Sequence, residues 1–131
     1  MLFVCVHNAG RSRMAEAFFN DLARGRYTAM SAGTEPARAP HPEVVEAMAE
    51  IGVEIDEGPG RLLTEEDAGH ARVVVTMGCS IEEACPALTV PVEDWGLEDP
   101  KGQPAERVAE IRDEIELRVR NMIGRFDRPD H

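Results

Sequence analysis

The chain has 131 residues, a length that fits one domain with one hydrophobic core, and we expect a single domain over residues 1–131. The formal net charge is −11, which argues against binding to nucleic acid or to an anionic membrane, and aromatic residues make up only 5% of the chain, too few to favour a stacking platform for bases. No apolar stretch is long enough to span a bilayer or to act as a signal peptide, so we expect a cytoplasmic protein.

The first half of the chain alternates between strand and helix patterns. Residues 2–6 are an apolar run typical of a buried strand, and apolar spacings of three and four then predict a helix from Ser12 to Gly25. A second strand is predicted at 27–32 and a second helix at 43–51, which Gly52 ends.

The second half continues the same alternation. Thr64 begins a short helix, 72–77 predict a central parallel strand, 88–92 predict a fourth strand near a sheet edge, and a helix over about 104–122 precedes a loose tail at 124–131. Strands that alternate with helices predict an α/β fold in which a parallel sheet carries helices on both faces. Ligands of such sheets bind beyond the carboxyl ends of the strands.

The stretch C-V-H-N-A-G-R-S joins the first predicted strand to the first predicted helix. It places a thiol, Cys5, at the end of the strand and a guanidinium, Arg11, at the start of the helix. Backbone N–H groups of the turn and the helix N-terminus form an anion cradle that also stabilises a nucleophilic thiolate, and Arg11 can hold a tetrahedral oxyanion through paired hydrogen bonds. We therefore expect an oxyanion site made by His7, Asn8, Ala9, Gly10, Arg11 and Ser12.

Three side chains of this turn have competing roles. Ser12 is a natural helix N-cap, and its hydroxyl is also placed to donate to the Cys5 thiolate, so both roles stay open. Asn8 tolerates a left-handed backbone, and we expect its amide to hold the loop in shape. His7 lies in the middle of the loop, which favours a loop residue over a general base.

Two further cysteines, Cys79 and Cys85, flank the stretch S-I-E-E-A. No C-x-x-C pattern or close histidine accompanies them, which argues against a zinc site, and we expect no metal. We favour a redox pair over two inert thiols, since three cysteines in a reducing compartment cannot form a fully paired framework. A helix would separate their α-carbons by ~9 Å, more than the ~7 Å that a disulfide allows, so we expect this segment to be a mobile loop or a frayed turn.

The stretch V-E-D-W-G-L-E-D-P ends in Asp99-Pro100. Pro100 keeps Asp99 out of the helical region, and a carboxyl group on such a loop can protonate a departing oxygen. The other acidic residues of the stretch, Glu93, Asp94 and Glu98, fit a solvated turn.

Four stretches of the chain resemble arsenate reductases of the low-molecular-weight tyrosine phosphatase-like family. They are F-V-C-V-H-N-A-G-R-S-R-M-A-E-A, S-A-G-T-E-P, V-V-T-M-G-C, and E-D-W-G-L-E-D-P-K-G-Q with R-D-E-I. The resemblance covers nearly the whole chain and implies a flavodoxin-like three-layer fold with a four-stranded parallel sheet. It also implies reduction of arsenate to arsenite, with no tightly bound cofactor and with electrons from an external dithiol such as thioredoxin.

The resemblance further implies a role for each site residue. Cys5 attacks arsenate, Asp99 protonates the leaving oxygen, Arg11 and the loop amides hold the oxyanion, and Ser12 stabilises the thiolate. Cys79 then attacks Cys5 and releases arsenite, and Cys85 attacks Cys79 to leave a Cys79–Cys85 disulfide. Two thiols that become one disulfide supply the two electrons that arsenic(V) needs to become arsenic(III).

The chain departs from the family pattern at two places. One residue fewer separates Cys79 from Cys85 than in the better-known thioredoxin-coupled members, and D-E-G-P-G-R replaces a more polar segment. Some relatives use a low-molecular-weight thiol, such as mycothiol, with a glutaredoxin-like protein, so the electron donor stays open.

Three other functions fit part of the pattern. A phosphatase acting on phosphotyrosine or small phosphate esters would use Cys5, Arg11, Ser12 and Asp99 but would not need Cys79 or Cys85, and weak phosphatase activity can accompany the reductase. A phosphocarrier with a strand-end cysteine has less need of an arginine clamp or an acid. A thiol redox sensor would turn over no oxyanion.

Overall fold

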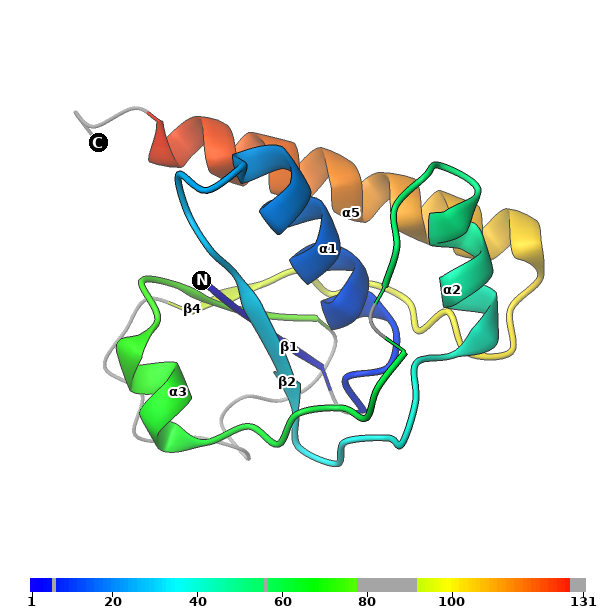
Figure 1. Ribbon diagram of the computed structural model, residues 1–131, viewed down its shortest axis with the longest axis horizontal. Helices are drawn as coiled ribbons and strands as arrows, with labels where there is room; N and C mark the ends of the chain where they lie inside the picture. The colour runs from blue at the N-terminus through cyan, green and yellow to red at the C-terminus, as the bar shows by residue number, and fades with distance from the viewer. Residues whose placement is uncertain (6, 56, 78–91, 128–131) are drawn as a thin grey trace.

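The computed structural model of the protein describes residues 1–5, 7–55, 57–77 and 92–127 (Figure 1). In order, its strands and helices are β1 (Leu2–Cys5), α1 (Arg11–Ala23), β2 (Met30–Gly33), α2 (Pro42–Ala49), α3 (Glu65–His70), β3 (Val74–Thr76), β4 (Val92–Asp94) and α5 (Ala105–Phe126). This order follows the predicted pattern, with two helices in succession between β2 and β3 and with residues 78–91, between β3 and β4, outside the description.

The four strands form one parallel sheet in the order β2-β1-β3-β4. β1 lies inside the sheet, where Leu2 pairs with Met30 of β2 on one side and with Val74 of β3 on the other. β4 is an edge strand, as predicted, and it covers Val92–Asp94, whereas the prediction was 88–92. Residues 88–91, Pro91 among them, lie outside the described part of the chain.

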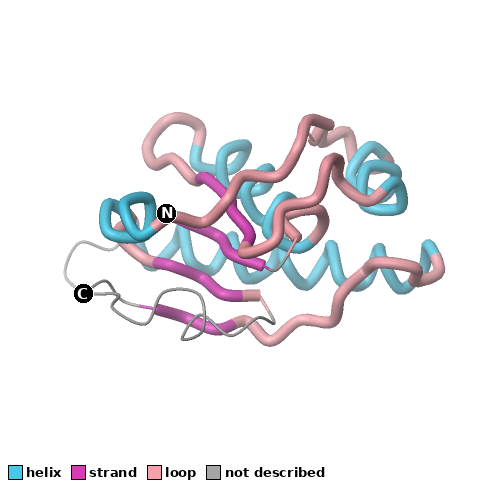
Figure 2. Tube along the Cα trace, turned by 90° about the horizontal axis from the view of Figure 1, so that it is seen from below, coloured by secondary structure: helices cyan, strands magenta, loops and turns pink. Residues whose placement is uncertain are grey.

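Helices cover both faces of the sheet, which confirms the predicted α/β architecture (Figures 1 and 2). Successive side chains of β1 point to opposite faces. Phe3 and Cys5 join the larger core cluster with buried residues of α1, α2 and α5, while Leu2 and Val4 pack on the other face with Ala68 of α3. The carboxyl end of β1 therefore carries Cys5 to the rim of the sheet on the face covered by α1.

The second strand is shorter and later than the predicted range 27–32. After α1 the chain turns through two residues of positive φ, Arg24 at 47° and Gly25 at 85°. Asn20 then holds the following segment, because its side chain both donates to the carbonyl of Ala29 and accepts from its N–H. Tyr27 stacks on helices instead of joining the sheet, with its ring 6.4 Å from that of Phe19.

The helix boundaries also correct two predictions. α2 runs over Pro42–Ala49 where 43–51 was predicted, with Gly52 at a φ of 77° just past its end. α5 continues to Phe126, so the prediction of a loose tail is wrong for residues 124–126. The ring of Phe126 packs 5.4 Å from that of Tyr27, and Asp127 accepts hydrogen bonds from Arg26 and from the Tyr27 hydroxyl, which holds this end of the helix in place. Residues 128–131 are outside the described chain.

In the described part of the chain, the helices are too short or too polar to cross a bilayer.

Candidate active site

The loop after β1 turns its backbone carbonyls outward. The carbonyl oxygens of residues 7–10 each accept a hydrogen bond from a group outside the loop; the donors are Ala37 N at 2.9 Å, Arg13 Nε at 2.6 Å, His41 N at 2.8 Å and Met14 N at 3.0 Å. In a planar trans peptide the N–H points opposite to the preceding C=O, so the N–H groups of residues 8–11 are directed to the inner side of the loop. The loop therefore has the backbone geometry expected of an anion cradle, and it ends at the first turn of α1.

Asn8 holds the cradle in shape, as predicted from its type. Its φ is 49°, in the left-handed region that asparagine tolerates. Its side-chain Oδ1 accepts from the backbone N–H of Arg61 at 2.9 Å, and its Nδ2 donates to Ser12 Oγ at 2.8 Å. Because a backbone N–H can only donate, this pair of bonds fixes which side of the Asn8 amide faces Ser12.

Ser12 links the loop to the nucleophile. Its Oγ lies 2.8 Å from Cys5 Sγ, and both side chains are buried. The Ser12 oxygen accepts from Asn8 and keeps its own hydrogen, so Ser12 is able to donate to the sulfur when Cys5 is a thiolate. The second role considered for Ser12, the helix N-cap, is wrong: Gly10 is the N-cap residue of α1, and Ser12 lies inside its first turn.

Arg11 and Asp99 meet at the mouth of the site. The Arg11 guanidinium donates from Nη1 to the carbonyl oxygen of Leu97 at 2.7 Å, and its Nη2 lies 4.0 Å from Asp99 Oδ2. The Asp99 side chain is 47% exposed, and its Oδ1 accepts from the N–H of Lys101. Trp95, buried against Phe3 with the rings 5.6 Å apart, anchors the segment that brings Asp99 to this position.

These groups line one small pocket at the rim of the sheet. Its lining residues are Cys5, His7, Ala9, Gly10, Arg11, His41 and Asp99. His7 occupies the loop as predicted, with its Nδ1 bonded to the carbonyl of Glu35 at 3.0 Å. The predicted nucleophile, clamp and acid thus reach the same pocket from two segments separated by more than eighty residues.

His41 was not among the predicted site residues. It precedes α2, and its ring and the Asp99 carboxyl line the same pocket. Burial lowers the pKa of His41 from its ordinary value, while the negative charges of Asp99 and Glu43 act in the opposite direction. Little in the sequence indicated that His41 belongs to the site, because a histidine before a proline that begins a helix is also typical of an ordinary loop.

Gly10 packs closely against the segment that carries Asp99. A Cβ at this position would lie 3.1 Å from Pro100 Cγ and 3.3 Å from His41 Cδ2, so the segment that carries Asp99 rests directly on the loop. We expect Gly10→Ala to destabilise the protein by about 1–3 kcal/mol. It should also weaken phosphate binding, because Asp99 and His41 are displaced. Thermal unfolding and calorimetric titration with phosphate measure both effects.

Gly69→Ala is the matched control for this change. A Cβ at Gly69 of α3 meets no atom within 4 Å, and alanine favours a helix, so this variant should be as stable as the parent or more stable by up to about 1 kcal/mol. If the Gly10 and Gly69 variants have the same thermal stability and the same affinity for phosphate, the packing at Gly10 does not position the loop.

Asn8→Asp should separate loop shape from thiolate stabilisation. The change keeps the size of the side chain but replaces the Nδ2 donor with an oxygen, which cannot donate to Ser12 and adds a negative charge beside Cys5. We expect the rate at which iodoacetamide alkylates Cys5 at neutral pH to fall about tenfold or more. Peptide-resolved mass spectrometry reports this rate for each cysteine separately.

Asn20→Asp serves as the control for that variant. Asn20 also bonds backbone through its amide, at the other end of α1, and its residue is exposed. The Asn20→Asp variant should leave the alkylation rate of Cys5 unchanged. A similar loss of rate in both variants would mean that added charge alone, not the Asn8–Ser12 bond, sets the reactivity.

Cys79 and Cys85 lie outside the described residues, and so does the segment for which unwinding was predicted. Among residues 1–5, 7–55, 57–77 and 92–127, no group of three or more His, Cys, Asp or Glu side chains is placed to hold a metal ion. Cys5 is a free, buried thiol.

The family model for low molecular weight phosphotyrosine protein phosphatase matches residues 1–130. The chain belongs to this family. Among its relatives, a protein of Halobacterium salinarum that is provisionally named an arsenate reductase is 43% identical over 133 residues, which cover 98% of this chain and 93% of that protein. A glutaredoxin arsenate reductase of Synechocystis is 34% identical over 128 residues, covering 96% of this chain and 97% of that one.

Solved structures of the family show the same arrangement of elements. The thioredoxin-dependent arsenate reductase of Corynebacterium glutamicum superposes with a TM-score of 0.82 at 35% identity, over 96% of this chain and 60% of that one. The low molecular weight protein tyrosine phosphatase of T. tengcongensis superposes with a TM-score of 0.83 at 29% identity, over 95% and 97% of the two chains. The family fold is therefore common to reductases and phosphatases, and the fold alone does not separate the two reactions.

Proposed function

We propose that this protein reduces arsenate to arsenite, with Cys5 as the nucleophile and with Cys79 and Cys85 as the source of electrons. The observation that carries the proposal is the bond between Cys5 Sγ and Ser12 Oγ at the base of a pocket that Arg11 and Asp99 also line. Relatives named arsenate reductase that align with nearly the whole chain give it further support.

The first step is attack of Cys5 on arsenic. The N–H groups of the cradle and the Arg11 guanidinium bind the arsenate oxygens and neutralise their charge. The thiolate, which the Ser12 hydroxyl stabilises, forms a sulfur–arsenic bond, and Asp99 gives a proton to the oxygen that leaves as water. Asp99 suits this role because its carboxyl group lies at the mouth of the pocket and is half exposed, so it can be reprotonated from solvent.

The second step is reduction. The Cys79 thiolate attacks the Cys5 sulfur, the sulfur–arsenic bond breaks, and its electron pair goes to arsenic, which leaves as arsenite. Cys85 then attacks Cys79, which frees the Cys5 thiolate and leaves a Cys79–Cys85 disulfide. The described part of the chain is compatible with this relay, because β3 lies beside β1 and Met77 N donates to the carbonyl of Val4 at 2.9 Å, so Met77, two residues before Cys79 in the sequence, lies next to the end of β1 that carries Cys5.

The cycle needs an external dithiol to reduce the final disulfide. Thioredoxin is our first choice, and a glutaredoxin or mycothiol type of donor is the second; relatives carry both kinds of name. A reducing compartment such as the cytoplasm suits such a cycle. We also propose that residues 1–131 act as one catalytic domain.

A coupled assay tests the reaction and the donor together. Arsenate, purified thioredoxin, thioredoxin reductase and NADPH are mixed with the protein, and arsenite is measured beside NADPH oxidation. We expect one arsenite for each NADPH consumed. Hydrolysis of para-nitrophenyl phosphate without any arsenate-dependent NADPH oxidation, under thioredoxin and glutaredoxin alike, would favour the phosphatase instead.

A further inference from the structure

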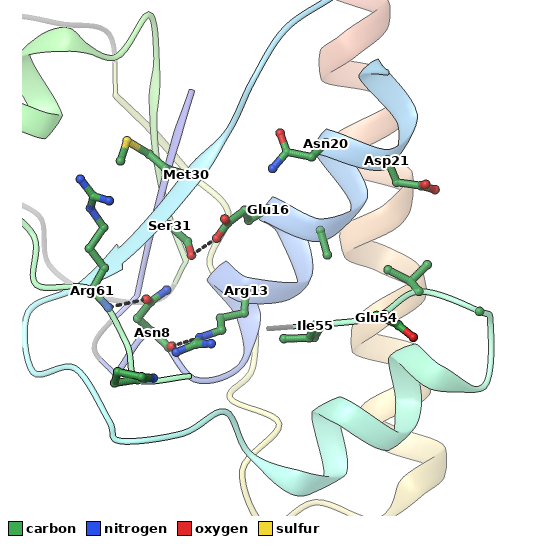
Figure 3. A pocket seen from close by; sticks show the side chains of 14 residues that line it. Asn8, Arg13, Glu16, Asn20, Asp21, Met30, Ser31, Glu54, Ile55 and Arg61 are labelled. Carbon is green, nitrogen blue, oxygen red and sulfur yellow. Dashed lines mark hydrogen bonds between the residues drawn. The ribbon is translucent and has the colours of Figure 1, made fainter. Parts of the chain in front are cut away.

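Arg13 is a buried cation that the reaction described above does not use. It lies in the first turn of α1, on the side of the loop away from the catalytic pocket, and only 7% of the residue is exposed. Its Nε donates to the carbonyl oxygen of Asn8 at 2.6 Å, and its Nη2 donates to the carbonyl oxygen of Gly58 at 2.7 Å. Figure 3 shows the guanidinium of Arg13 directed at the loop, next to Asn8.

The four outward-turned carbonyls of the cradle are not held in the same way. Those of His7, Ala9 and Gly10 accept from backbone N–H groups, which no side-chain substitution removes. The carbonyl of Asn8 accepts from the Arg13 side chain. Of these four carbonyl bonds, the one from Arg13 is the one that depends on the identity of a side chain.

We propose that Arg13 is a positioning residue for the oxyanion site, which it shapes from behind by holding the Asn8 carbonyl and tying the loop to the segment at Gly58. The inference rests on the proposed function in so far as the cradle is the site where the oxyanion binds. It assigns to Arg13 no contact with substrate.

The hydrogen bonds of Asn8 explain how Arg13 would act at a distance. The peptide that joins Asn8 to Ala9 has its carbonyl on Arg13 and its N–H on the inner side of the loop. Without Arg13 this peptide loses the bond to its carbonyl, and we expect its N–H to turn away from the inner side of the loop. The Asn8 side chain moves with its backbone, so the bond from Nδ2 to Ser12, and through it the support of the Cys5 thiolate, weakens as well.

The test uses the full chain with Arg13→Gln and Arg13→Lys, and inorganic phosphate as the probe. Phosphate should protect Cys5 from iodoacetamide, and peptide-resolved mass spectrometry gives the phosphate concentration for half protection. We expect Arg13→Gln to raise this concentration about tenfold, the loss typical of a hydrogen bond to a charged group, and to slow alkylation of Cys5 at neutral pH. Arg13→Lys keeps the positive charge but loses the paired donors of the guanidinium. Its phosphate concentration for half protection should therefore lie between those of the parent and of Arg13→Gln.

Arg112→Gln is the matched control. Arg112 of α5 is 8% exposed, and its Nη1 donates to the carbonyl of Ala47 at 2.7 Å, so it is an equally buried arginine that holds a backbone carbonyl away from the site. It should lower the midpoint of thermal unfolding without changing phosphate protection. If Arg13→Gln and Arg112→Gln lose stability alike and neither alters phosphate protection or alkylation of Cys5, Arg13 is only structural and the inference is overturned.

Rescue by free guanidinium adds a readout that a general loss of stability would not give. A cavity of about 750 Å³, lined by Arg13, Arg61, Glu16 and other residues, opens beside the loop and gives guanidinium a route to the vacated position (Figure 3). In Arg13→Ala, millimolar guanidinium should restore phosphate protection, whereas in Arg112→Ala it should change nothing. Absence of rescue together with normal phosphate protection in Arg13→Lys would contradict the inference. These arms use phosphate, so they stand even if arsenate proves not to be reduced.

Discussion

Replacing Cys5 with serine is expected to abolish arsenate turnover, with a loss of at least about 10⁴-fold, because removing the nucleophile of a covalent mechanism leaves only binding and polarisation. Serine keeps the size of the side chain at a position that is 3% exposed, so the fold should survive. Its hydroxyl is a far weaker nucleophile than a thiolate at neutral pH. Arsenite release and ester hydrolysis should fall together.

Phosphate binding is the control for that variant. The cradle amides and Arg11 do not depend on the sulfur, so calorimetric titration should still detect phosphate bound to Cys5→Ser. Loss of turnover with retained phosphate binding assigns Cys5 to the chemistry. Turnover that persists in Cys5→Ser would mean that another thiol attacks arsenate.

The second large effect is expected at the two later cysteines, and it differs between them. Pre-reduced Cys79→Ser, mixed with arsenate and no external reductant, should release no arsenite, because nothing displaces arsenic from Cys5. Pre-reduced Cys85→Ser should release one arsenite per chain and stop as a Cys5–Cys79 disulfide. Arsenic speciation and non-reducing peptide mapping distinguish these end states.

Ester hydrolysis separates this account from the phosphatase. Water resolves a phosphocysteine without a second thiol, so hydrolysis of para-nitrophenyl phosphate should survive in Cys79→Ser and in Cys85→Ser. A full yield of arsenite from Cys79→Ser would show that Cys79 does not supply electrons to arsenate, and the proposed disulfide relay would then be wrong.

The residues that act through local chain geometry were predictable from the sequence. The positions of Cys5 and Arg11 are set by neighbouring parts of the chain: the end of β1, a short loop and the start of α1. These bring a thiol, N–H donors and a guanidinium together within a few residues. The left-handed backbone of Asn8 follows from its residue type, and the alternation of strands and helices predicts the parallel sheet.

What escaped prediction depends on contacts between distant segments. Ser12 has the residue type of an N-cap, but its hydroxyl is occupied by Cys5 and Asn8, and the N-cap position falls on Gly10, which packs closely against Pro100 and His41. The position of Arg13 depends on the carbonyl of Gly58, which lies 45 residues further along the chain, and its residue type alone gives no sign of that contact.

We expect the thiols of this chain to deliver two electrons to arsenate, and a single-turnover measurement tests this without any choice of donor. The fully reduced protein is mixed with excess arsenate in the absence of reductant, then quenched with acid and alkylated. One arsenite per chain should form, with Cys79 and Cys85 joined in a disulfide and Cys5 still open to alkylation. Three alkylated cysteines and no arsenite, from a protein that hydrolyses para-nitrophenyl phosphate, would contradict it.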